Sequence, residues 1–313
     1  MSTATDAPAG EGRAPSGPER LRRGEWIAVF KRTFKQFMAD DCMGLSQQIA
    51  YSSLLAFFPA VVFLVAVLGL IGAYDELQSF LNPVAPKSVT DLIEQLQQDS
   101  GGGTSAAAAV LGAFGAVWAG SGAMGSIVKA VNRAYDRLET RPFWKVRVIS
   151  LVLVVASGLV LAGMLLLIVL GGKLGDAIAR KARLSGAFTF FWDIFRWPAA
   201  FVAVLLLFAL IYYLAPNAQP RNWKWITPGS LVGSLMWLAL SGLFALYTAF
   251  SSSYSKTYGA LAGGIVLLLW LNYSAWAVLF GAELNAELDR QADIRAAGGE
   301  KAGLVKPARR VQT

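Results

Sequence analysis

The residues of this sequence with the most chemical potential are polar side chains inside long apolar stretches. Tyr258, Asn272 and Glu283 fall within about 60° of one another on a helical wheel, and Glu287 extends the same stripe. An amide or carboxylate facing lipid would be costly, so Asn272 and Glu283 are expected to face other helices or water. For Glu283 the expected partners are Gln48, or Lys129 and Asn132. A polar stripe of this kind is typical of a substrate or ion pathway.

A second polar group lies in the first apolar stretch, where Gln48, Ser52 and Pro59 share one helical face. Pro59 cannot donate a backbone hydrogen bond to the carbonyl of Leu55, which lies on that face. The freed carbonyl beside two polar side chains is a candidate binding site, as in the broken helices of transporters. The alternative is that neighbouring helices or serine side chains satisfy that carbonyl.

A third group is formed by Ser230, Ser234 and Ser241, which lie on one face of the apolar stretch 226–250. Gly229 and Gly233 in the same stretch form a small-residue contact motif. The hydroxyls either join helices to one another or line a polar path, and the sequence leaves both readings open.

The composition argues against metal-dependent or nucleophilic catalysis. The chain has no His, the residue most often used to bind metals and to transfer protons near neutral pH. Its single Cys cannot form a thiolate cluster within the chain. We therefore predict no catalytic residues, no metal site and no cofactor. No G-x-x-x-x-G-K-[ST] loop is present, so any transport is not driven by ATP bound to this chain itself.

These residues have to be positioned by membrane-spanning helices. The chain is 55% hydrophobic and 15% charged, with a mean hydropathy of +0.49, which is typical of a polytopic membrane protein. We predict an all-α fold of six transmembrane helices, at residues 47–72, 106–132, 148–171, 197–214, 226–250 and 258–283. Residues 188–195 are interpreted as an interfacial lead-in to the fourth span. Residues 74–105 form an acidic loop.

The segment before the first span predicts an amphipathic helix at residues 26–38. Trp26, Phe30, Phe34 and Phe37 recur at helical spacing among Lys31, Arg32 and Lys35, so this helix is expected to bind anionic lipid headgroups. The predicted domains are a disordered cytoplasmic tail (1–25), a membrane domain (26–290) and a second, disordered cytoplasmic tail (291–313). The net charge of +8 fits basic membrane-flanking loops better than nucleic-acid binding.

The basic residues also predict the orientation. With six spans, 21 of the 28 Lys and Arg residues lie on the side of the two termini. Because positively charged loops stay in the cytoplasm, both termini are predicted to be cytoplasmic. The basic third loop opposes this rule.

The segment from Thr227 to Leu288 resembles the signature of the YihY/BrkB family of bacterial inner-membrane proteins, formerly labelled ribonuclease BN. The likeness rests on a Pro-Gly opening, a Tyr-Gly pair, an apolar stretch ending in Trp, and a closing Gly-Ala-Glu-x-Asn. QQIAYSSLLAFFPAVVFL in the first span and the run of Asn132, Tyr135, Glu139 and Arg141 support it. The resemblance implies the fold and an inner-membrane location, and it implies no agreed reaction.

Three functions remain open. The first is a transporter or translocator of a lipid-like or small amphiphilic substrate, which the polar stripes and Pro59 favour. The second is a structural or envelope-assembly protein without transport, with a second copy or an envelope protein as partner. The third is a membrane-bound ribonuclease, which the lack of His and the scarcity of carboxylates in the spans disfavour.

Overall fold

The computed structural model describes residues 23–71, 106–169, 181, 186–217, 226–250 and 260–296. Long α-helices make up nearly all of this part of the chain, and it contains no strand. The helices are α1 (Arg23–Ala39), α2 (Cys42–Ile71), α5 (Ala106–Ala134), α6 (Phe143–Val169), α8 (Gly186–Leu214), α9 (Pro228–Phe250) and α11 (Ala260–Ala296). Six of them, all except α1, are long and apolar enough to cross a membrane. The predicted all-α fold with six spans is confirmed.

The helix bounds differ most from the prediction in α8 and α11. α8 begins at Gly186 and includes the segment interpreted as a lead-in, because that segment is itself rich in Phe and Trp. Its two charged residues, Asp193 and Arg196, form an ion pair at 3.5 Å, which lowers the cost of placing them in an apolar helix. α11 continues past Glu283 to Ala296, so its 37 residues measure about 56 Å, well over one bilayer crossing.

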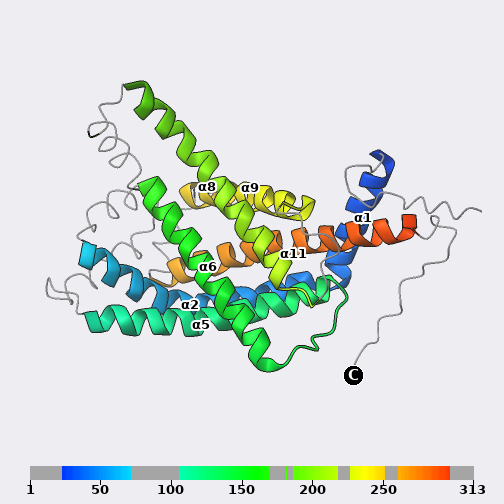
Figure 1. Ribbon diagram of the computed structural model, residues 1–313, viewed down its shortest axis with the longest axis horizontal. Helices are drawn as coiled ribbons and strands as arrows, with labels where there is room; N and C mark the ends of the chain where they lie inside the picture. Colours follow the sequence, from blue (N-terminus) through cyan, green and yellow to red (C-terminus); the bar gives the residue numbers. More distant parts are fainter. Residues whose placement is uncertain are drawn as a thin grey trace, which may run out of the picture.

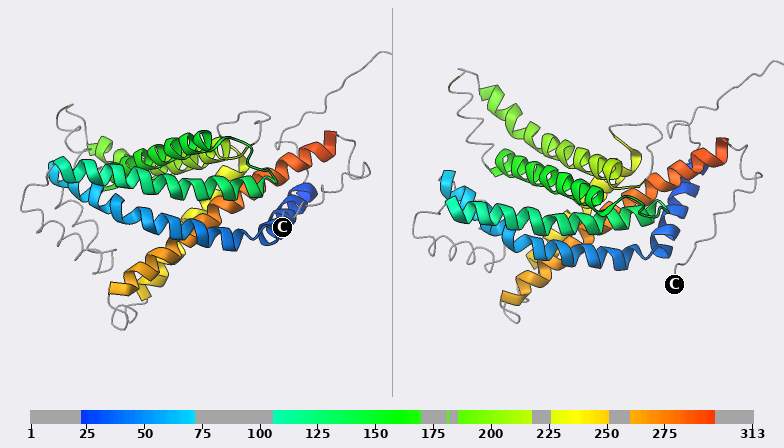
Figure 2. Two further views of the ribbon diagram at one scale, coloured as in Figure 1. Left: turned by 90° about the horizontal axis from the view of Figure 1, so that it is seen from below. Right: turned by 60° about the horizontal axis from the view of Figure 1, so that its bottom comes forward.

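The spans come together at one end of the bundle, while α2 and α5 stay in contact along most of their length. α2 lies beside α5, α9 lies beside α11, and α11 also packs against α2 (Figures 1 and 2). Buried side chains gather near the starts of α2 and α9 and the ends of α5, α8 and α11, as at Ile49, Val131, Ile211 and Leu279. In the other halves of these helices most apolar side chains are exposed, as at Phe114 and Phe190. The close-packed end is the one at which α2 begins and α11 ends.

The first helix, α1, runs across the ends of the spans instead of along them (Figure 1). The change of direction follows Asp40 and Asp41, where Asp41 adopts a φ of 54°. This left-handed conformation ends α1, and the Asp41 side chain then accepts a hydrogen bond from the backbone N–H of Gly44 in the first turn of α2. The expected amphipathic helix therefore exists, and its C-terminal end lies next to the close-packed end of the bundle.

Candidate functional site

Two carboxylates on consecutive turns of α11 are buried at the close-packed end. Glu283 is 0% exposed and Glu287 is 1% exposed. The Cys42 thiol donates to Glu283 Oε1 at 3.4 Å, which connects α11 to the start of α2. Glu287 instead accepts from two guanidinium groups, those of Arg32 at 3.0 Å and of Arg290. Contacts of these two carboxylates thus join α11 to the start of α2 and to α1.

The ion pairs of Glu287 extend into a network that joins three parts of the chain. Arg32 of α1 also donates to Gln291 Oε1 at 2.6 Å. Arg290 reaches Asp136, which follows α5, at 2.9 Å. Because Glu287 is nearly inaccessible, losing either arginine would leave a buried charge less well compensated. The network therefore ties α1 and the end of α5 to the last turns of α11.

Next to this network, α9 and α11 touch backbone to backbone. The backbone N–H of Gly229 donates to Asn285 Oδ1 at 2.9 Å, and Asn285 Nδ2 donates to Thr227 Oγ1 at 3.0 Å, so Asn285 caps the start of α9. A Cβ at Gly281 would lie 2.6 Å from the Gly229 carbonyl oxygen. Tyr212 of α8 closes the contact by donating to the Val278 carbonyl at 2.8 Å. The Pro-Gly opening and the Gly-Ala-Glu-x-Asn close of the sequence signature thus meet in one helix–helix contact.

A second polar contact joins the turn after α5 to the end of α8. Arg141 donates to Glu139 at 2.6 Å and to the Ala215 carbonyl at 2.8 Å, near the C-terminal end of α8. Asn132 bridges the two sides, since its amide donates to Glu139 and accepts from the backbone N–H of Asn217. The hydrogen bonds from Arg141 hold the pKa of Glu139 below its ordinary value. We call Asn132, Glu139, Arg141 and Asn217 the α5–α8 clamp.

The buried cluster extends toward the α5–α8 clamp through Tyr135. Burial raises the pKa of Tyr135 well above its ordinary value, and the nearby carboxylates of Asp289 and Glu283 add to this rise. A phenol in these surroundings stays protonated at neutral pH. Tyr135 can therefore act as a hydrogen-bond donor near Glu283 and Asp289.

The structure places the predicted polar residues of α2 at a contact with α5. Ser52 Oγ lies 3.2 Å from Ser126 Oγ, within hydrogen-bond distance. Pro59 packs against α5, where a Cβ at Gly115 would lie 3.2 Å from the proline ring. Gln48 is exposed. These three residues therefore do not meet in a single site, although Ser52 and Pro59 lie along the same helix pair.

The predicted serines of α9 mostly bond to backbone or to tryptophan. Ser230 and Ser234 are buried, and their hydroxyls donate to carbonyls one turn back, those of Thr227 and Ser230. Ser241 accepts from Trp270 Nε1 of α11 at 3.2 Å. A matching bond runs the other way, from Trp237 of α9 to Ser274 of α11 at 3.0 Å. The hydroxyl of Ser241 thus joins helices.

The remaining predicted residues lie apart from one another. Asn272 is half-buried on α11, nearly three turns before Glu283. Tyr258 lies outside the described residues, as do the acidic loop at 74–105 and most of both predicted tails. Asn132, one expected partner of Glu283, bonds to Glu139 and Asn217. The bond from Cys42 to Glu283 was not anticipated.

Sequence reasoning missed several members of the buried cluster. Arg32 was grouped with Lys31 and Lys35, yet it shares a helical face with Val29 and Gln36, which are buried. The spacing of Arg32 from Val29 and Gln36 is the signal that could have distinguished Arg32 from the two exposed lysines. Cys42 is the single cysteine of the chain, and its small, weakly polar side chain does not by itself predict a carboxylate partner. Its position depends on the turn at Asp41.

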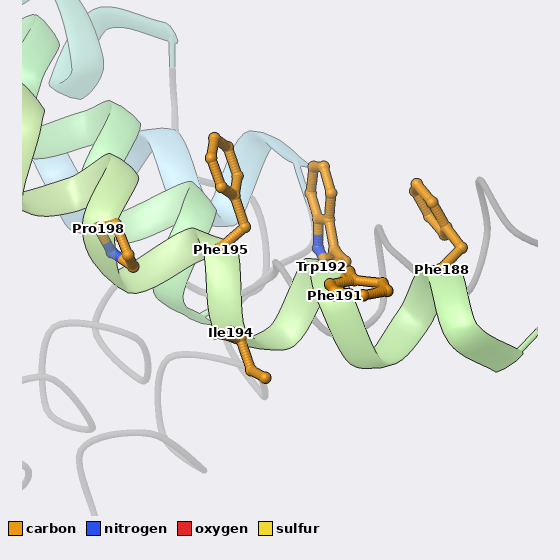
Figure 3. Close-up of a pocket in the computed structure, with 6 residues that line it drawn as sticks. All are labelled: Phe188, Phe191, Trp192, Ile194, Phe195 and Pro198. Atoms are coloured by element: carbon orange, nitrogen blue, oxygen red, sulfur yellow. The ribbon is translucent and has the colours of Figure 1, made fainter.

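A shallow hollow on α8 offers no alternative site. The side chains that line it all come from one helix and are apolar or aromatic (Figure 3), namely Phe188, Phe191, Trp192, Ile194, Phe195 and Pro198. Apart from the indole N–H of Trp192, lining of this kind supplies no polar group to orient a substrate. Within the described ranges, no group of three His, Cys, Asp or Glu side chains is arranged to hold a metal ion.

Comparison with known proteins places the chain in a family. Residues 33–304 match the family described as Virulence factor BrkB, and this range covers most of the chain. The chain belongs to the BrkB family. The resemblance inferred from the sequence signature is thereby confirmed, and the protein is an integral membrane protein of this family.

Similar proteins within the BrkB family carry general names. YfkH of Bacillus subtilis, named a ribonuclease-like protein, is 28% identical over 85% of this chain and 96% of its own length. UPF0761 membrane proteins are 24% identical in Laribacter hongkongensis, over 87% of this chain, and 25% identical in Xanthomonas campestris, over 86%. The chain spans 63% of the length of these two UPF0761 relatives. No solved structure matches it.

Proposed function

We propose that the protein translocates a lipid-like or small amphiphilic substrate across the bacterial inner membrane, with proton binding at Glu283 as the coupling step. The observation that carries this proposal is the complete burial of Glu283 in the last third of a candidate membrane span. An ionisable side chain inside a span is costly and marks a functional site by default. No ATP-binding loop is present in the sequence, so an ion gradient is the natural energy source.

Of the two buried carboxylates, Glu283 lies closer to the middle of the α11 span, which supports it as the proton-binding residue. Glu287 accepts hydrogen bonds from Arg32 and Arg290. Glu283 faces the Cys42 thiol, which is a weak hydrogen-bond donor. Other charged or titratable groups near this pair are Asp41, Arg133, Tyr135 and Asp289.

The exposed apolar halves of the spans fit an amphiphilic substrate. Away from the close-packed end, large apolar side chains of α5 and α8 face outward, including Leu111, Phe114 and Phe191. The acyl part of a lipid can follow such a surface while its polar part passes the half-buried Asn272. The substrate class is therefore one with a hydrocarbon portion.

Flux measured with purified protein in liposomes tests this function. A fluorescent phospholipid should cross the bilayer faster than in empty liposomes, and an imposed pH gradient should increase the rate. Glu283→Gln should fold with an unchanged melting temperature and lose the response to the gradient. Asp193→Asn, which removes an exposed carboxylate of α8, is the matched control and should keep the response to the gradient. Wild-type flux equal to that of empty liposomes would reject translocation of this substrate class.

A structural role without transport is the second candidate, and the serine contacts favour it. Ser241 and Ser274 are engaged by tryptophans of the neighbouring helix, as expected of residues that fix helix packing. If this role is correct, Glu283→Gln should lower the melting temperature, and neither protein should move lipid.

We further propose that the chain is not a ribonuclease, although one relative has a ribonuclease-like name. RNA hydrolysis needs a general base or a metal-bound water. The chain has no His, and its described part shows no metal-binding group. Purified protein freed of soluble nucleases should leave RNA intact; cleavage that Glu283→Gln abolishes would refute this proposal.

A further inference from the structure

One face of α1 is apolar and points away from the bundle. Ile27, Phe30, Phe34 and Met38 are 59%, 39%, 64% and 53% exposed. Their spacing of three or four residues places them within about 80° on the helix. We call these four residues the outer stripe. The opposite face, which includes Val29 and Gln36, is buried. Phe37 lies at the border of the two faces and is buried, with its ring 6.0 Å from that of Phe280.

The contacts of the inner face fix the depth of α1 in the membrane. Val29 packs with Leu284 and Leu288, and Arg32 pairs with Glu287. A bilayer crossing uses about 20 residues and the candidate span of α11, Gly263–Ala292, has 30, so the turn with Glu287 and Leu288 falls near its boundary. The turns of α11 that hold α1 therefore lie at headgroup level. Since α1 also runs across the ends of the spans (Figure 1), it lies along the boundary between hydrocarbon and water.

The charges of α1 match an anionic surface. Lys31 and Lys35 are exposed and lie along one border of the outer stripe, whereas Arg32 points inward to Glu287. Lysines beside an inserted apolar face can extend their ammonium groups to the phosphate level. Each basic residue near an anionic leaflet contributes ~1 kcal/mol, or about fivefold in binding. The same border of α1 carries no exposed acid between residues 26 and 38.

From these contacts we propose that α1 is an in-plane anchor that inserts the outer stripe into the leaflet at the close-packed end and binds anionic phospholipid headgroups through Lys31 and Lys35. This inference does not depend on translocation. Arg32 connects this anchor to the buried Glu287.

An environment-sensitive fluorophore at position 34 tests this proposal. Phe34→Cys protein is labelled with a nitrobenzoxadiazole dye and placed in nanodiscs of phosphatidylcholine with or without phosphatidylglycerol. Protein carrying only the buried Cys42 corrects for background labelling. Arg137→Cys, at an exposed position after α5, provides the water-facing reference. The dye at position 34 should emit at shorter wavelength than the reference and be quenched by nitroxide-labelled lipids.

Charge reversal separates lipid binding from simple burial. In Lys31→Glu/Lys35→Glu protein the increase in quenching caused by phosphatidylglycerol should disappear. Lys145→Glu, at an exposed lysine outside α1, should retain it. An unchanged melting temperature in neutral detergent shows that the double variant still folds. A dye at position 34 that emits like the reference would overturn the proposal. So would a dye that is shielded from water but not quenched by lipid nitroxides, because a second copy of the chain would then cover the stripe.

Discussion

Single glycines decide whether α9 and α11 can touch. A Cβ at Gly281 would meet the hydroxyl of Tyr212 and the carbonyl of Gly229, and backbone atoms cannot move aside cheaply. Gly281→Ala should therefore cost about 1–3 kcal/mol of stability, as overpacking typically does. Thermal unfolding in detergent measures the loss. Gly264→Ala on the same helix meets no atom within 4 Å and is the control; equal melting temperatures for the two variants would contradict the contact.

The charge of Glu139 should make stability depend on pH. The pKa of Glu139 is lowered in the folded protein by Arg141, relative to an unfolded value of about 4.3. A lowered folded-state pKa adds stability above the unfolded value, and this stability is lost as the pH falls through the folded value. The melting temperature of wild type should exceed that of Glu139→Gln above about pH 5, and the difference should shrink at more acidic pH. A difference that is constant down to acid pH would refute this.

At the scale of elements, the α5–α8 clamp depends on the fork geometry of Arg141. Its guanidinium reaches Glu139 and the carbonyls of Leu214 and Ala215 together. Lysine keeps the charge and cannot satisfy these acceptors at once, so Arg141→Lys should cost about 1–3 kcal/mol. Arg137→Lys, at an exposed neighbouring position, should be neutral. The thermal unfolding midpoints of the two variants test this prediction, and equal midpoints would contradict it.

The hold of α1 on the bundle should depend on Arg32. Arg32→Met removes the bonds to Glu287 and Gln291 and leaves Glu287 with Arg290 as its charge partner. We expect faster amide hydrogen exchange across α1, because local opening becomes easier. Lys31→Met, measured in neutral detergent where no anionic lipid is present, is the matched control. Unchanged exchange in both variants would show that apolar packing alone holds α1.

At the scale of the whole molecule, the first span begins and the last span ends on the same side of the bundle. α2 begins and α11 ends at the same close-packed end (Figure 2). The distribution of Lys and Arg predicts that this side is cytoplasmic. Reporter fusions after residues 98 and 291 should report the periplasm and the cytoplasm, respectively. A cytoplasmic signal at residue 98 would overturn the predicted topology.

Much of the fold was determined by the sequence alone. Apolar runs of 20 or more residues can only be membrane helices, because the bilayer leaves no other way to satisfy the backbone, so the six spans and the all-α class could be predicted. The signature from Thr227 to Leu288 indicated the family, and the periodic aromatic residues predicted α1. These are local properties, since each depends on residues a few positions apart.

The tertiary structure alone decided which side chains meet. Glu283 and Cys42 are 241 positions apart, and nothing in their local sequence indicates that they share a hydrogen bond. Arg32 and Lys31 are neighbours on one helix, yet one is ion-paired to Glu287 while the other is exposed. The physical reason is that a helix fixes only the angle between its own side chains. Which face turns toward protein, and which toward lipid, depends on how helices distant in the sequence pack.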